Sequence, residues 1–139
     1  MKYIMSKLFL LLCIMIMNNG IYANNDKPFV IPEIKHWESY SGDFTITNKT
    51  RIVCNKNNNE LFEVAQLLSS DYEKMFGIKL KVEDKISKGG VISLNIVNNE
   101  NYGNECYCID IHENVVITAN SVRGAIWATR TILQIAEQN

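Results

Sequence analysis

Residues 107–139 read YCIDIHENVVITANSVRGAIWATRTILQIAEQN and contain two strand patterns followed by one helix pattern. Tyr107, Ile109 and Ile111 alternate with polar residues, and after a short polar turn a β-branched run begins at Val115. Alternation with a period of two is typical of a strand with one buried face, and two such runs joined by a short turn are typical of a hairpin. We therefore expect a β-hairpin that leads directly into the last helix.

The helix pattern begins after Asn120 or Ser121, either of which can cap its first turn. Its apolar residues recur three and four positions apart, which is the spacing of one helix face. This face consists of Val122, Ala125, Ile126, Thr129, Ile132, Leu133 and Ala136. We expect it to pack against the core of the domain.

Trp127 falls on the opposite side of this helix, in one stripe with three polar residues. The stripe consists of Arg123, Trp127, Arg130 and Gln134. Because the apolar face already packs the helix against its own core, we expect the stripe to be an interface with another domain and to have no structural role within this one. The alternative is a single exposed Trp127 that lies under the aliphatic stems of the arginines.

No Gly or Pro stop signal follows this helix before Asn139. Helices usually end at such residues, so the pattern predicts either a helix that frays at Asn139 or a sequence written to continue. The second interpretation implies a truncated or fragmentary product of a longer protein.

A second helix pattern covers residues 60–76, with Asn59 as the expected N-cap and Gly77 just past the last turn. Strand patterns lie on both sides of it, at residues 43–47, 52–53, 78–82 and 91–97, with turns at Asn48 and at Gly89-Gly90. The order of strands and helices predicts an α+β fold, a mixed β-sheet with two helices packed on one face.

The first 23 residues have the form of a secretory signal peptide. Lys2 and Lys7 precede an apolar run, and Ile21-Tyr22-Ala23 is a plausible cleavage site. The apolar run is shorter than the roughly 20 residues that a membrane span needs. Lipidation at Cys13 is the less favoured alternative, because the preceding residue is Leu12. We expect a secreted or periplasmic protein whose mature part, residues 24–139, is one domain.

Composition excludes several partners. The formal net charge is −1, and no basic run is interleaved with aromatic residues, so neither nucleic acid nor an anionic membrane is expected as a partner.

Cys106, Cys108, Asp110 and His112 share one face of one strand, which raises the question of a metal site. Alternate strand residues are about 6.6 Å apart, so the outer two of the four would lie about 20 Å apart. Zinc bonds are only about 2.0 to 2.3 Å long. We therefore expect no metal site and no cofactor. The chain also has no recognisable carboxylate pair and no nucleophile motif, so no catalytic residue is predicted.

Several motifs, in this order, resemble the N-terminal accessory domain of family 20 glycoside hydrolases, the β-N-acetylhexosaminidases. The motifs are Val30-Ile31-Pro32, Gly42-Asp43-Phe44-Thr45-Ile46, Thr50-Arg51-Ile52, Gly77-Ile78 with Leu80 and Val82, Glu105 to Ile111, and Gly124-Ala125 with Thr131 to Ile135. Two positions depart from the family pattern, since Cys106 and Ala128 stand where the family usually has Gly.

The resemblance implies a non-catalytic accessory domain whose partner is a catalytic (β/α)8 barrel in the parent protein. In that family the barrel follows this domain and carries an adjacent Asp-Glu pair and a sugar-binding Arg, none of which has a counterpart in this sequence. The chain alone is therefore expected to be inactive.

Two alternatives remain open. One is a freestanding module that binds a glycan or a protein through Trp37, Tyr40 and Trp127, although the sequence lends glycan contact no support. The other is the equivalent domain of another glycosidase family, such as α-glucuronidase.

Overall fold

The computed structural model describes residues 26–41, 43–85 and 90–138. The signal peptide expected over residues 1–23 and Gly89 of the expected turn lie outside them. The elements are β1 (Arg51–Cys54), α2 (Asn59–Phe76), β2 (Lys81–Glu83), β3 (Val91–Ile96), β4 (Tyr107–Ile111), β5 (Val115–Ala119) and α3 (Val122–Glu137). Among the described residues, no helix has the length and apolar character that crossing a bilayer requires.

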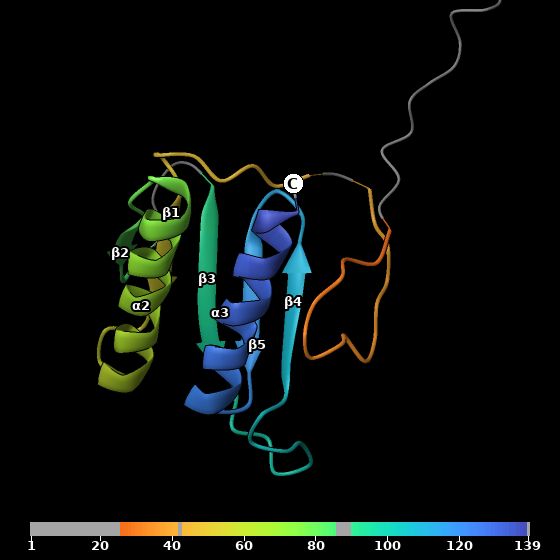
Figure 1. Ribbon diagram of the computed structural model, residues 1–139. Coiled ribbons are helices and arrows are strands. Elements are labelled where there is room, and N and C mark those ends of the chain that lie inside the picture. The colour runs from red at the N-terminus through yellow and green to blue at the C-terminus, as the bar shows by residue number, and fades with distance from the viewer. Residues whose placement is uncertain (1–25, 42, 86–89, 139) are drawn as a thin grey trace, which may run out of the picture.

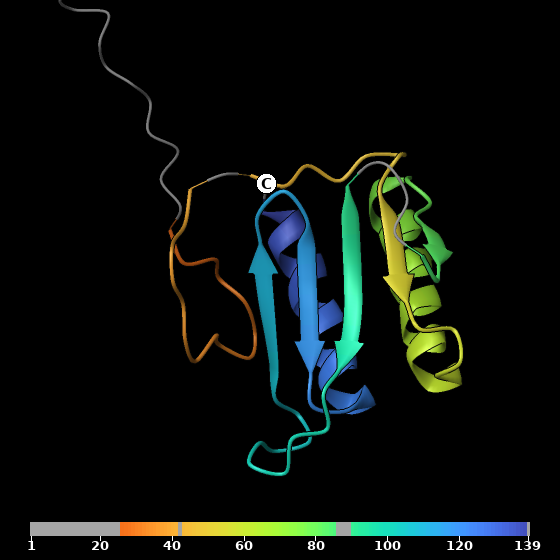
Figure 2. The same ribbon diagram turned by 180° about the vertical axis from the view of Figure 1, so that it is seen from behind.

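The strands form one sheet in the order β2-β1-β3-β5-β4. Neighbouring strands are parallel except for β4, which pairs with β5 in the antiparallel direction. The last pair is the expected hairpin, with Ile109 opposite Ile117. Both helices cover the same face of the sheet (Figures 1 and 2). The prediction of a mixed sheet with two helices on one face is confirmed.

Helix α2 follows its sequence pattern closely, apart from its first residue. The predicted cap, Asn59, is wrong by one position, because the side chain of Asn58 accepts the hydrogen bond from the backbone N–H of Leu61 at 3.0 Å. A cap at Asn58 makes Leu61 the third helical residue, which is the usual donor to a capping side chain. At the other end Gly77 adopts a left-handed φ of 72° and its N–H donates to Glu73, as expected for a C-cap.

Two strand predictions are wrong, the first in the existence of the strand and the second in its limits. Residues 43–47 form no strand, although Phe44 and Ile46 do pack against the core. Strand β1 already pairs with β2 on one side and β3 on the other, which leaves no free edge there for the preceding segment. The strand expected at 78–82 begins only at Lys81, and Leu80 before it is buried. In both places the alternation of apolar and polar residues reflects which side chains are buried. It does not indicate that the segment pairs with a strand.

Helix α3 begins after Ser121, whose side chain accepts from the N–H of Gly124, but its buried face is rotated from the predicted one. Ala125, Thr129, Ile132 and Leu133 are buried as expected, whereas Ile126 is 38% exposed. The additional buried residues are Gly124, Ala128 and Thr131.

Small residues explain this rotation. A Cβ at Gly124 would lie 2.7 Å from the backbone oxygen of Cys106, so glycine lets the helix approach the start of β4 closely. Farther along, the hydroxyl groups of Thr131 and Tyr107 are 2.7 Å apart and hydrogen-bonded. Close backbone approach therefore determined which side of α3 faces the sheet, and the larger Ile126 was left at the edge.

Candidate docking surface

The outer sides of α2 and α3 form a shallow groove of about 440 Å³. The two helices lie side by side in front of the sheet (Figure 1). Its apolar lining consists of Val64, Leu67, Val122 and Ile126, and its charged lining of Glu60, Glu63 and Arg123. The groove therefore has an apolar floor with acidic side chains on α2 and a basic one on α3.

Large apolar side chains are exposed around this groove. Leu67 is 43% exposed, Ile126 38% and Trp127 42%. Leu67 and Ile126 come from different helices and line the same groove. Trp127, the next residue of α3, is also exposed but does not line the groove. Single exposed apolar residues are ordinary, but exposed apolar residues from two helices that line one groove indicate a contact surface. We call Leu67, Ile126 and Trp127 the apolar strip.

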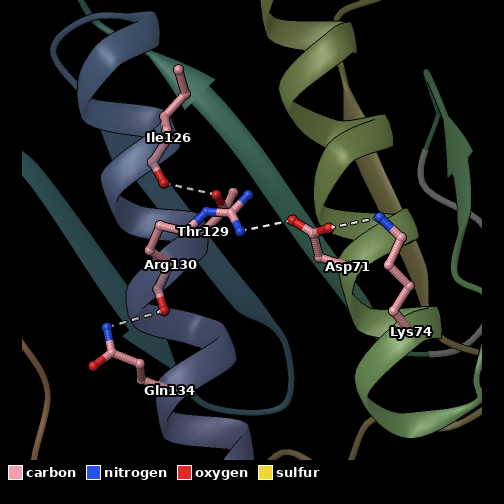
Figure 3. A network of polar contacts seen from close by, with 6 residues as sticks. All are labelled: Asp71, Lys74, Ile126, Thr129, Arg130 and Gln134. Atoms are coloured by element: carbon pink, nitrogen blue, oxygen red, sulfur yellow. Dashed lines mark hydrogen bonds and ion pairs between the residues drawn. The ribbon is translucent and has the colours of Figure 1, made fainter.

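An ion pair joins the two helices (Figure 3). Arg130 Nη1 on α3 lies 2.7 Å from Asp71 Oδ2 on α2, and Lys74 Nζ lies 3.5 Å from the other carboxylate oxygen. The hydrogen bond from Arg130 is the main cause that lowers the pKa of the Asp71 carboxyl below its usual value, and Lys74 adds to it against the opposing effect of burial. The prediction that Arg130 has no structural role within the domain is therefore wrong.

Gln134 is also bonded within the domain. Its side-chain oxygen accepts from the N–H of Ile31 at 2.9 Å, and its side-chain nitrogen donates to the carbonyl of Ile31 at 3.0 Å. The expectation of no local role is wrong here too. Arg123 has only a long contact of 3.8 Å with Glu105, and both side chains are more than 60% exposed. Of the predicted stripe, Arg123 and Trp127 thus remain the most exposed, while Arg130 and Gln134 hold other segments in place.

The site predicted from the sequence does not include Leu67, and the sequence pattern places Ile126 in the core. A signal for Leu67 was present, because Leu67 and Leu68 are adjacent in a helix with one buried face. Adjacent helical residues point about 100° apart, so both cannot lie at the centre of the same face. No comparable signal identified Ile126, whose exposure depends on the rotation of α3.

In the part of the chain that the structure describes, the other chemistry-bearing side chains do not assemble into a reactive centre. Among the described residues, no group of three or more His, Cys, Asp and Glu side chains is arranged to hold a metal ion. Cys108 lies 3.9 Å from an oxygen of Asp110, and burial, followed by this carboxylate, raises the pKa of the thiol. A raised thiol pKa reduces the fraction of reactive thiolate at neutral pH. Tyr40 donates to Glu38 at 2.5 Å, and its ring lies 5.4 Å from that of His112.

We expect Asp71→Asn to lower the free energy of unfolding by about 0.5 to 1 kcal/mol at pH 7, because the side chain of Arg130 is 36% exposed and water screens the pair. A lowered carboxyl pKa stabilises the fold above the unfolded-state value near 3.8, and the contribution disappears as the pH falls through the lowered folded value. Urea unfolding from pH 7 to pH 2.5 should therefore show the two proteins converging below about pH 4. The control is Asp84→Asn, on an exposed residue; a difference for Asp71 that stays constant with pH would contradict the ion-pair assignment.

Taken together, these features define a small α+β domain whose sheet and helices build a core and whose helical side carries an exposed apolar strip. Residues 27–139 match the family described as glycosyl hydrolase family 20, domain 2, and the chain belongs to this family. The match covers an accessory domain and includes none of the catalytic barrel.

A solved structure supports the same assignment. The chain is similar to the GH20 β-N-acetylhexosaminidase from Streptomyces coelicolor A3(2), with a TM-score of 0.60 and 25% sequence identity. The alignment covers 76% of this chain and 21% of that enzyme, so the chain spans about a fifth of the enzyme's length. No curated protein sequence matches the chain significantly.

Proposed function

We propose that this chain is the non-catalytic accessory domain of a β-N-acetylhexosaminidase-like glycoside hydrolase, and that the outer side of α2 and α3 docks onto the catalytic barrel. Support comes from the family, in which this unit is domain 2, and from the similar Streptomyces enzyme, most of whose chain lies outside the aligned part. The signal-peptide pattern in residues 1–23 supports export, so the parent protein acts outside the cytoplasm in this proposal.

One observation carries the docking proposal: Leu67 and Ile126 are both exposed, on different helices, and line one groove. Other residues of both helices pack into the buried core against the sheet. Burying apolar surface is favourable by about 25 cal/mol per Å². A partner that covers the apolar strip therefore adds a favourable free energy of burial that is absent in the isolated domain.

The first test is enzymatic. The purified chain should release no p-nitrophenol from the N-acetyl-β-glucosaminide or N-acetyl-β-galactosaminide above a no-protein control, because it offers no carboxylate pair of the kind that glycoside hydrolysis uses. Initial rates should be measured before and after a second chromatographic step. Turnover that copurifies with the chain and survives that step would overturn the non-catalytic assignment.

A further inference from the structure

Gln134 of α3 and Gln138, the residue at its C-cap, hold the N-terminal segment by its backbone. Gln134 exchanges two hydrogen bonds with the N–H and carbonyl of Ile31, at 2.9 and 3.0 Å. Gln138 exchanges two with the N–H and carbonyl of Phe29, at 3.0 and 2.7 Å. Each primary amide thus satisfies one backbone donor and one backbone acceptor, as a neighbouring strand would. We call residues 29–31 the strap.

The spacing of the two glutamines matches the strap. Residues four apart on a helix are separated by about 6 Å along its axis, and residues two apart on an extended chain by about 6.6 Å. Gln134 and Gln138 can therefore bind Ile31 and Phe29 at the same time, with the strap antiparallel to the helix. Gln138 also donates to the carbonyl of Gln134 at 2.8 Å, which helps to fix its amide.

This arrangement decides where the side chains of the strap point. Because the backbone groups of Phe29 and Ile31 face α3, the two side chains share one side and Val30 takes the other. Val30 is 3% exposed and anchors the strap, whereas Phe29 is 77% and Ile31 70% exposed, the highest values among the large apolar residues described. Apolar side chains are thus exposed on a segment whose backbone is held by four hydrogen bonds.

The strap is continuous with the surface already described. Gln134 lies two turns along α3 from Trp127, on the same side of the helix, so the strap is attached where the α3 part of that surface ends. Building on the proposed function, we propose that Gln134 and Gln138 position the strap so that Phe29 and Ile31 become part of the surface that docks onto the catalytic barrel. The partner in this proposal is that barrel alone, because most of the similar enzyme lies outside the part that aligns with this chain.

The clamp is tested first in the chain by itself. In the double variant Gln134→Ala, Gln138→Ala, the amides of Phe29 and Ile31 lose their acceptors, so their hydrogen exchange should accelerate by roughly tenfold or more. The matched control is Gln66→Ala, an exposed glutamine on α2, which should leave both amides unchanged. Equal exchange in the double variant and in the unaltered chain would overturn the clamp.

Docking is tested in a chimera in which this chain replaces the aligned domain of the Streptomyces enzyme. Phe29→Ser with Ile31→Ser should lower the exchange protection of the amides of Phe29, Ile31 and α3 in the chimera more than in the isolated chain. If this pair of changes has the same effect in both settings while Trp127→Ala weakens docking, the role of the strap is overturned and the proposed function stands. If Trp127→Ala also acts equally in both settings, both proposals fail.

Discussion

Leu68→Ala should lower the free energy of unfolding of the isolated chain by about 3 kcal/mol, whereas Leu67→Ala should lower it by no more than about 0.5 to 1 kcal/mol. The two residues are neighbours in α2 with the same side chain. Leu68 is fully buried in the core beneath the helix, and Leu67 is 43% exposed beside the outer groove. The large effect comes from lost burial and from the cavity that truncation leaves in a close-packed interior.

Urea unfolding followed by circular dichroism measures the free energy of unfolding of both variants. Because each substitution is Leu to Ala, the change in helix propensity is the same in both. Removing the partly exposed Leu67 also relieves the isolated chain of some apolar surface, which keeps its cost small. Equal losses for the two variants would show that α2 is rotated from the described position and that the apolar strip does not exist.

Helix α2 shows what the sequence can determine. Its core face is made of large apolar residues at regular spacing, and both of its ends have capping residues, so its type, extent and orientation follow from local pattern. Only the N-cap was misplaced by one residue, since Asn58 and Asn59 are chemically equivalent candidates and the choice depends on backbone conformation at Asn58.

Helix α3 shows why the buried face of a helix cannot always be predicted from the sequence. Gly124 lies close to the backbone at the start of β4, and Ala128, one turn further on, is fully buried; the small size of both residues allows close packing but contributes little to an apolar pattern. A hydrophobic pattern weights Ile126 more heavily and so rotates the predicted face toward it. A backbone carbonyl lies close to Gly124 only once the hairpin and the helix have packed together, so the local sequence does not reveal this contact.

Only those residues of the candidate site could be predicted whose role depends on exposure alone. Trp127 is exposed, in agreement with its position opposite the apolar face. Arg130 and Gln134 instead have hydrogen-bond partners 59 and 103 residues away in the sequence. The spacing of residues within one helix cannot predict such contacts. The same reason applies to the strap, whose exposed side chains follow from a clamp between the two ends of the described chain.

Loss of docking is the second large effect that we expect. Leu67→Ser with Trp127→Ser removes two exposed anchors from the surface, and anchors of this kind each account for about 2 kcal/mol or more in well-packed interfaces. In the isolated chain the same changes should cost about 1 kcal/mol at most, because neither side chain is fully buried there. Val116→Ser is the matched control, since Val116 is 37% exposed on the sheet face that the helices do not cover.

The most direct test is native-state hydrogen exchange at the buried amides of β3 and β5, which reports the free energy of unfolding of this domain in the isolated chain and in the Streptomyces chimera. We expect the unaltered domain to be more stable in the chimera, Leu67→Ser with Trp127→Ser to remove this gain, and Val116→Ser to leave it intact. An equal stability of the unaltered domain in both settings, or a gain that survives the double change, would contradict docking through the outer side of α2 and α3.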